Sequence, residues 1–148
     1  MNILFHALLG LLLAELFGIN SIPGTLVGVL FSVFPDFDHI PHVKKAIRSG
    51  RFGVESRSSL HELIGLVFIS LGSLAVGIVH PHLSLLGFSC GLSHFVVDLL
   101  TRPSRPLYPF SSRKVDLNLY PKGLKDMFVW DAVFTAALGL VYVIARMV

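Results

Sequence analysis

Residues 83–100 read LSLLGFSCGLSHFVVDLL, and this stretch decides the class of fold. Apart from the imidazole of His94 and the carboxylate of Asp98, its side chains are apolar or small. A helix of about 20 apolar residues is long enough to cross the hydrocarbon core of a bilayer. The stretch therefore predicts a membrane helix, and its two ionisable residues require an explanation of their own.

Four further apolar stretches lie along the chain, at residues 3–19, 25–34, 60–79 and 127–148. The second of them is short for a full span. It crosses the bilayer only if it begins near Ile22 and continues through residues 35–38, and otherwise it is re-entrant. Helices are expected because backbone polar groups in lipid must be paired within the segment. We predict an all-α fold, a polytopic membrane helix bundle of about five membrane helices.

The composition agrees with a single integral-membrane domain over residues 1–148. Apolar residues make up 53% and charged residues 14% of the chain, and the mean hydropathy is +0.75. The charged share is about half that of a soluble domain, which argues against a disordered chain, a coiled coil and an ordinary water-soluble enzyme. The single cysteine, Cys90, excludes an internal disulfide and a cysteine-based zinc cluster.

The positions of the basic residues indicate the orientation of the helices. Eleven of the twelve Lys and Arg residues lie between the second and third stretches or between the fourth and fifth, and the turns at residues 20–24 and 80–82 carry none. A five-helix chain places those two loops on one side, and such loops stay cytoplasmic. We expect the cell inner (cytoplasmic) membrane, with the N-terminus inside. The pI near 9.3 then reflects topology and the lipid bilayer rather than nucleic-acid binding.

On this topology each of the five stretches places ionisable residues at the cytoplasmic end. They are His6, Asp36, Asp38, His61, Glu62, His94, Asp98 and Asp131. An Asp at the centre of a membrane helix costs about 2.5–3.5 kcal/mol on insertion scales, so residues of this kind are functional candidates. His94 and Asp98 are four residues apart, hence about 40° around the helix axis and about 6 Å along it. Both side chains can therefore reach one ion.

Imidazole and carboxylate donors together suit a divalent zinc, manganese or iron ion rather than copper(I) or calcium. We predict a site for such a divalent metal, with zinc as the first choice and manganese or iron as alternatives. The expected metal ligands are His6, Asp36, Asp38, His61, His94 and Asp98.

Each of these residues also has a simpler interpretation. A histidine on a membrane helix often forms a hydrogen bond between helices, and Asp36 can end a helix beside Pro35. Asp98 can pair with Arg102, four residues later. Asp131 is interpreted as a residue that pairs inside the bundle or stabilises the N-terminus of its helix.

Three further polar residues are left out of the predicted site. Glu15 lies nine residues after His6, on the opposite face of the first helix and at its outer end. We expect it to be an interfacial or helix-pairing residue. His80 and His82 belong to the outer turn and are expected to be solvated.

The motifs of the chain resemble those of a known family. The matching blocks are His6, the run PDFDH at residues 35–39, SHFVVDLLT at residues 93–101 and PLYP at residues 106–109. In these blocks the sequence is similar to the YdjM-like family of predicted membrane-bound metal-dependent hydrolases, and the resemblance covers nearly the whole chain. The resemblance implies a metal site and a hydrolase activity.

One central motif departs from the family pattern. Relatives have His-Arg-x-x-Thr-His-Ser where this chain reads SRSSLHE at residues 56–62. Arg57 and His61 are kept, whereas Ser56 and Glu62 stand at the first and last positions. If the first His is a ligand in relatives, this chain has lost that ligand or replaces it with Glu62 or His42. Glu62 is also a candidate to act on the reacting water.

The leading hypothesis is a membrane-bound metal-dependent hydrolase with its site at the cytoplasmic end of the bundle. The metal would lower the pKa of a bound water toward about 7, and the catalytic residues Glu62 or Asp36 would take its proton. The predicted substrate is a phosphate ester or a lipid head group, because guanidinium groups of the flanking loops suit phosphate. The substrate-binding candidates are Arg57, Arg102, Arg105 and Arg113.

Two other functions stay open from the sequence alone. The first is a noncatalytic metal-binding or metal-transporting membrane protein, although transporters place their sites near the bilayer midplane between broken or repeated helices. The second is a scaffold in which polar residues only hold helices together. The first would bind metal without hydrolysing esters, and the second would contain no metal after purification.

Overall fold

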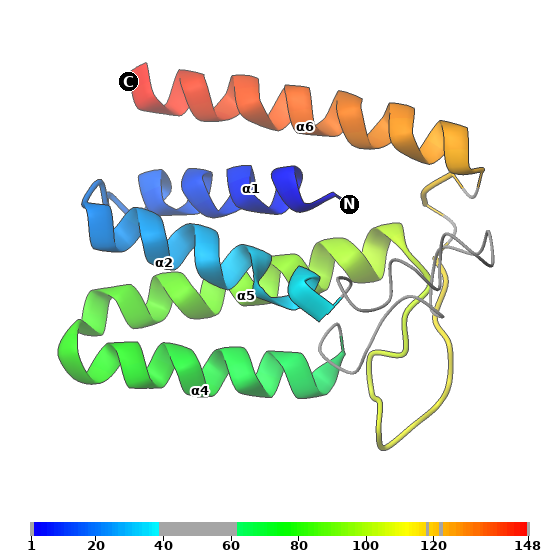
Figure 1. Ribbon diagram of the computed structural model, residues 1–148, viewed down its shortest axis with the longest axis horizontal. Coiled ribbons are helices and arrows are strands. Elements are labelled where there is room, and N and C mark those ends of the chain that lie inside the picture. The colour runs from blue at the N-terminus through cyan, green and yellow to red at the C-terminus, as the bar shows by residue number, and fades with distance from the viewer. Residues whose placement is uncertain (1, 39–61, 118, 122, 148) are drawn as a thin grey trace.

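The computed structural model describes residues 2–38, 62–117, 119–121 and 123–147, without the side chains of Asp38 and Leu124. Five α-helices make up most of this part of the chain (Figure 1). They are α1 (Ile3–Leu16), α2 (Ile22–Val33), α4 (Leu63–Val79), α5 (Pro81–Thr101) and α6 (Leu124–Met147), and the 3-10 helix η1 (Phe34–Asp38) follows α2. The predicted all-α fold is confirmed.

Successive helices run in opposite directions along the long axis of the bundle (Figure 1). Helix α1 packs against α2, α5 and α6, and α5 packs against α2 and α4. As a result, α4 and α6 lie on opposite edges of the bundle, with the other helices between them. The start of α1, the end of α5 and the starts of α4 and α6 share one end, which we call the site end. The C-terminus lies at the other end.

Local sequence signals fix where the first two helices begin. The side-chain oxygen of Asn2 accepts a hydrogen bond of 2.8 Å from the backbone N–H of Phe5 and so caps α1. Ser21 caps α2 in the same way, through the N–H of Gly24 at 3.2 Å. The cap on α1 matters for function because His6 lies one turn after Asn2.

The second apolar stretch begins at Ile22 and continues past Pro35, which is the longer of the two predicted alternatives. Proline has no N–H to bond the carbonyl four residues earlier, and here the chain tightens into the 3-10 turns of η1. Together α2 and η1 form an apolar helix over Ile22–Phe37. The acidic residue that follows the proline, Asp36, is thereby buried in the bundle.

Helices α1 and α2 approach closely because small residues face each other. A Cβ atom on Gly28 would lie 2.7 Å from the carbonyl oxygen of Gly10 and 3.5 Å from the Cβ of Ala14. A Cβ atom on Gly10 would in turn overlap the carbonyl of Gly28 and crowd Ser32. Small residues at a helix interface permit such backbone contact in membranes. The contact draws His6, one turn before Gly10, into the interior.

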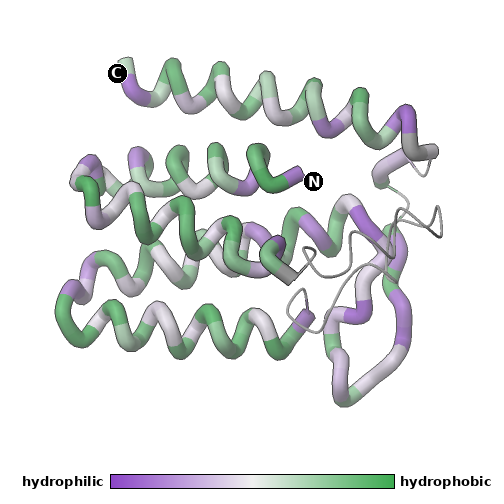
Figure 2. The backbone as a smooth tube through the Cα atoms, viewed as in Figure 1, coloured by the Kyte–Doolittle hydropathy of each residue, from purple (hydrophilic) through white to green (hydrophobic). Residues whose placement is uncertain are grey.

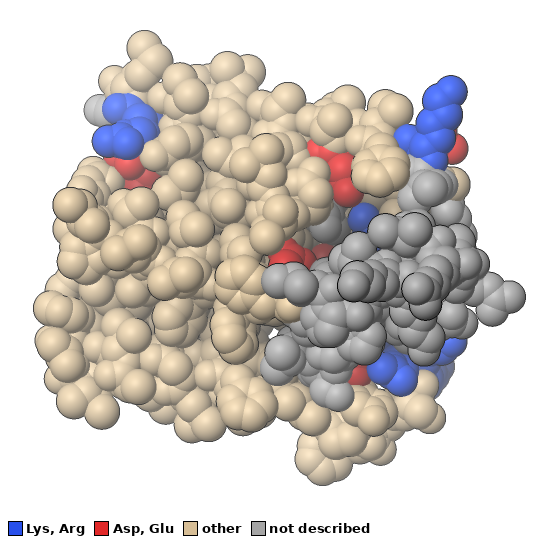
Figure 3. Space-filling view, viewed as in Figure 1, with Lys and Arg blue, Asp and Glu red and all other residues tan. Residues whose placement is uncertain are grey.

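The helices carry many hydrophobic residues (Figure 2), and on the face drawn in Figure 3 the charged side chains gather toward the two ends of the bundle. Exposed Leu, Ile, Val and Phe side chains lie on α1, α4 and α6. Of the described helices, α5 and α6 are the two that are long and apolar enough, by length and composition, to cross a membrane. Helices α1, α2 with η1, and α4 are shorter apolar helices. That all five helices cross the membrane stays a prediction.

The residues left out of the predicted site lie at the end of the bundle away from it. Glu15 pairs with Arg146 of α6, with 3.7 Å between Oε2 and Nε, so its helix-pairing role is confirmed. His80 and His82 are exposed in the tight turn between α4 and α5, as expected.

Candidate metal centre

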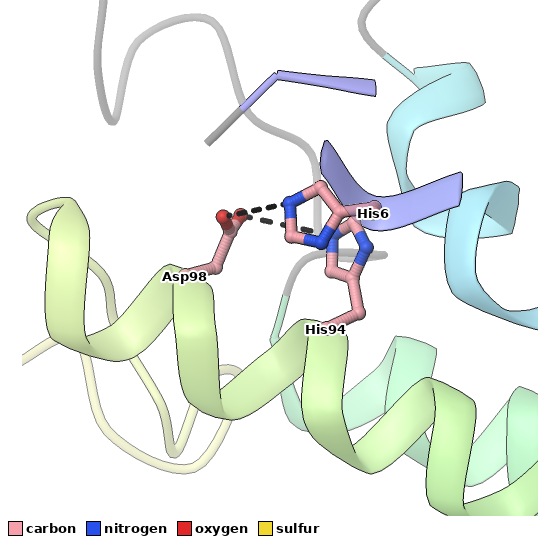
Figure 4. A group of neighbouring side chains, drawn as sticks. All are labelled: His6, His94 and Asp98. Carbon is pink, nitrogen blue, oxygen red and sulfur yellow. Dashed lines mark ion pairs between the residues drawn. The ribbon is translucent and has the colours of Figure 1, made fainter. Parts of the chain in front are cut away.

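Three ionisable side chains from two helices meet at the site end of the bundle (Figure 4). His6 comes from the first turns of α1, and His94 and Asp98 come from the last turns of α5. One donor atom from each lies within 4.8 Å of the other two. His6 Nε2 is 3.5 Å from Asp98 Oδ1, and His94 Nε2 is 3.8 Å from Asp98 Oδ2. The structure thus brings together three of the predicted metal ligands.

The surroundings of His6 indicate a place for a ligand. Its side chain is fully buried (0% exposed), and neither ring nitrogen has a hydrogen-bond partner in the described part of the chain. A buried polar atom without a partner costs roughly 1–3 kcal/mol. The neighbours of His6 are the carboxylate of Asp98 and the ring of His94, on which it stacks with centroids 3.8 Å apart. A cation shared with these neighbours would satisfy it.

The orientation of His94 is set by the backbone of α2. Its Nδ1 lies 2.6 Å from the carbonyl oxygen of Ser32. A carbonyl oxygen only accepts hydrogen bonds, so Nδ1 carries a proton, and in the neutral ring Nε2 carries the lone pair. Metal-binding histidines are usually held in this way, with the second ring nitrogen donating to a carbonyl or carboxylate. Because Nε2 faces the carboxylate of Asp98, the neutral ring presents its lone pair to the shared site.

The two distances from the imidazoles to Asp98 fit ligands of one ion better than they fit hydrogen bonds. Hydrogen bonds between nitrogen and oxygen measure about 2.7–3.2 Å. Two ligands held about 2.0–2.1 Å from a tetrahedral zinc ion lie about 3.3–3.5 Å apart. The separations of 3.5 and 3.8 Å exceed hydrogen-bond length and lie close to that spacing. Two imidazoles and a carboxylate are also the donor set of known catalytic zinc sites, so the residues fit such a metal.

Asp36 adds a second carboxylate beside the three residues. Its Oδ1 lies 3.9 Å from Nε2 of His94, and its side chain is buried. Asp36 does not belong to the group whose donor atoms all lie within 4.8 Å of one another. Asp36 is therefore adjacent to the triad of His6, His94 and Asp98. From this position its carboxylate can accept a proton from a group that the triad binds.

Three predicted site residues fall outside what the structure describes. Arg57 and His61 lie in residues 39–61, and the side chain of Asp38 is not described although its backbone ends η1. Their participation in the site stays a prediction.

Glu62 is held in an ion pair by the loop that follows α5. It lies just before α4 and is buried, and its Oε1 accepts a hydrogen bond of 2.9 Å from Nε of Arg105. The guanidinium of Arg105 also lies over the ring of Tyr108, 4.5 Å from the centroid. The second carboxylate oxygen, Oε2, is buried without a hydrogen-bond partner among the described residues. Glu62 thus ties this loop to α4, and it is not a member of the triad.

A second polar cluster joins α6 to the site ends of α1 and α5. Nη2 of Arg102 lies 3.4 Å from Oδ2 of Asp131, and the hydroxyl of Tyr120 donates to Oδ1 of the same carboxylate. The side-chain amide of Asn2 donates to Thr135 Oγ1 at 3.1 Å. Asp131 therefore pairs inside the bundle, as predicted. Arg102 pairs with this carboxylate of α6 in the structure.

Sequence reasoning did not identify Asn2 and Tyr120 as members of this cluster. Asn2 carries a detectable signal, because an Asn immediately before an apolar helix is a typical N-cap. Tyr120 has no recognisable sequence signal, because it lies in an irregular segment between two helices. Burial, followed by the hydrogen bond and charge of Asp131, raises the pKa of the Tyr120 hydroxyl above its usual range. Tyr120 therefore keeps its proton at neutral pH and remains a donor to Asp131.

The arginines predicted to bind a phosphate group occupy different environments. Arg102 and Arg105 each face a carboxylate, and Arg113 is exposed. Substrate binding by these residues stays a prediction.

Comparison with known proteins agrees with this arrangement. The model of the YdjM inner membrane protein family matches residues 1–148, the whole length of the chain. No curated protein and no solved structure matches the chain. The family description accords with an apolar helical bundle in which two helices are long enough to cross a membrane. By this match, the chain belongs to the YdjM inner membrane protein family.

Proposed function

We propose that this protein is a membrane-bound metal-dependent hydrolase with its site at the cytoplasmic end of the bundle. His6, His94 and Asp98 would hold a divalent ion, with zinc as the first choice and manganese or iron as alternatives. One observation carries the proposal: two buried imidazoles and a carboxylate meet at 3.5 and 3.8 Å, and His6 has no hydrogen-bond partner among the described residues.

The protein positions these three groups before any ligand arrives. The Ser32 carbonyl holds the ring of His94 in one tautomer. His6 lies one turn after the N-cap Asn2, and Asn2 is itself bonded to Thr135 of α6. Side chains fixed by such outer contacts keep the geometry that metal binding requires.

Asp36 is the residue best placed to take a proton in this site. A divalent ion, when bound, supplies a Lewis acid and a water of lowered pKa. The carboxylate of Asp36 lies beside His94 without belonging to the triad, so it can accept a proton from a water held there. Glu62 is the second candidate, and its pairing with Arg105 makes it less available.

A phosphate ester or a lipid head group is the proposed substrate class. The triad lies at one end of an apolar bundle, which would place it at the depth of lipid head groups if the helices cross the bilayer. Arg102 follows Asp98 by one helical turn, and Arg105 lies in the loop that continues from it. Guanidinium groups bind phosphate through paired hydrogen bonds. Arg102 or Arg105 would therefore bind a phosphate group if it released the carboxylate with which it now pairs.

The test is a hydrolysis assay on purified protein against phosphate esters, phospholipids and acyl esters. We expect activity to be lost on chelation and restored by a divalent metal. Asp36→Asn should lower kcat by about 10²–10⁴-fold, as for loss of a general base, while the metal content is retained. Glu15→Gln, which removes a carboxylate from the far end of α1, is the matched control and should be active.

Two outcomes contradict the proposal. Bound metal without hydrolysis of any ester would favour the noncatalytic metal-binding or metal-transporting alternative. Hydrolysis that continues after complete removal of metal would show that the triad has another purpose.

A further inference from the structure

The loop between α5 and α6 has a defined structure of its own. Ser104 and Val115 form an antiparallel bridge, with N–H···O distances of 3.0 and 2.8 Å, and so close the segment that we call loop 104–115. Within it, the N–H of Tyr108 donates to the carbonyl of Arg105 at 2.9 Å, and the N–H of Ser111 donates to that of Leu107 at 3.0 Å. These bonds join the two ends of the loop and form turns within it.

The loop is anchored at the site end of α4. Arg105 bonds Glu62 immediately before that helix and packs on Tyr108 within the loop. In Figure 1 the loop, drawn in yellow, lies beyond the start of α4 along the long axis of the bundle and extends sideways past it. The outer face of α4 is apolar, with Phe68 and Leu71 exposed. The loop therefore lies next to the start of the apolar helix α4, at the site end of the bundle.

The tip of loop 104–115 exposes large apolar side chains. Phe110 is 86% exposed and Leu107 is 59% exposed. In water this exposure is unfavourable, since burial of apolar surface is the main driving force of folding. Aromatic side chains at this level of a membrane protein typically enter the interface between head groups and acyl chains.

Positive charge lies directly beside this apolar tip. Arg113 and Lys114 are exposed, and neither forms an ion pair with another described residue. Basic residues near an anionic membrane surface are attracted to it, and the attraction is screened by salt. An apolar tip with adjacent basic residues is the pattern that binds a membrane surface.

We propose that loop 104–115 binds the membrane leaflet at the site end, with Phe110 and Leu107 in the interface and Arg113 and Lys114 at anionic phospholipid head groups. The bilayer is the partner because the exposed Phe110 and Leu107 lie next to the apolar helix α4, and the exposed basic residues complement anionic lipid in charge. Membrane binding by this loop requires no metal and is independent of the proposed hydrolase activity.

A tryptophan at the tip of the loop tests the proposal. Phe110→Trp is introduced with Trp130→Phe, so that the chain has one tryptophan, and the full chain is reconstituted in phosphatidylcholine vesicles with or without phosphatidylglycerol. Lipids brominated on the acyl chains are present in both leaflets, so that either insertion direction gives a signal. We expect emission at shorter wavelength than in water and quenching by the brominated lipid, both stronger with phosphatidylglycerol.

A second variant tests the charge contribution. Arg113→Ser with Lys114→Ser, in the same tryptophan reporter, should remove the dependence on phosphatidylglycerol, and high salt should do the same to the parent. Water-like emission with no quenching by brominated lipid would overturn the proposal. Quenching that is equal in both kinds of vesicle and unchanged by the double substitution would overturn the assignment to anionic head groups.

Discussion

His6 and His94 stack with their ring centroids 3.8 Å apart and their planes inclined by 25°. They come from α1 and α5, and each ring directs its Nε2 toward a different oxygen of the Asp98 carboxylate. The pair depends on three features outside the triad: the glycine contact between α1 and α2, the cap at Asn2 and the carbonyl of Ser32. Substitutions at a distance should therefore alter the site.

Gly10→Ala should destabilise the protein and reduce its metal content. A Cβ atom at Gly10 overlaps the carbonyl of Gly28, and a backbone carbonyl cannot rotate away as a side chain does. We expect a loss of about 1–3 kcal/mol in the free energy of unfolding, typical of overpacking. Gly139→Ala is the control, because its Cβ would meet Leu8 at 3.7 Å, an ordinary contact. Thermal unfolding in detergent compares them, and equal stability of the two variants would contradict the packing argument.

Tyr120→Phe should weaken the attachment of α6 at the site end. The substitution leaves Oδ1 of Asp131 without its hydroxyl donor, and an unsatisfied buried group costs about 1–3 kcal/mol. Unfolding of both proteins in the same detergent at pH 7 measures the difference. A variant as stable as the wild type would show that the hydroxyl contributes nothing to the attachment.

The contribution of Tyr120 should also depend on pH in a defined direction. Its pKa in the folded protein is raised above the ordinary value of about 10. The stabilisation is therefore fully present below pH 10 and is lost as the pH rises through the folded pKa. The stability difference between wild type and Tyr120→Phe should be constant from pH 7 to about 9 and shrink at higher pH. A difference that grows above pH 10 would contradict this.

Glu62→Gln should lower stability without removing metal. The buried carboxylate pairs with Arg105 and lies outside the triad, so the substitution weakens a charge-assisted hydrogen bond worth about 1.5–3 kcal/mol. Unfolding and metal analysis on the same preparation test both parts. A loss of metal at unchanged stability would instead place Glu62 among the ligands.

Periodicity and hydropathy predict most of the fold from the sequence. Long apolar runs predict α5 and α6, and the four-residue spacing of His94 and Asp98 predicts that both lie on one face of their helix. The continuation of α2 through Pro35 does not follow from the sequence, because hydropathy does not show whether a proline ends a helix or tightens it into a 3-10 turn.

Contacts across long distances in the chain are less predictable. Arg102 has a carboxylate four residues before it, yet it pairs with Asp131, because the packing of α6 brings that group close. Arg105 likewise reaches Glu62 through the shape of loop 104–115. Such pairings depend on how helices and loops are arranged in space, and the spacing of residues along the chain does not contain that information.

The central claim is that His6, His94 and Asp98 bind one metal ion, and the metal-to-protein ratio tests it most directly. Elemental analysis should compare wild type with His6→Ala, His94→Ala and Asp98→Ala, and with Glu15→Gln as the control. We predict about one divalent ion per chain in wild type and control, and a loss of bound metal in each triad variant. A wild type that takes up no zinc, manganese or iron, or triad variants that keep the wild-type ratio, would contradict the claim.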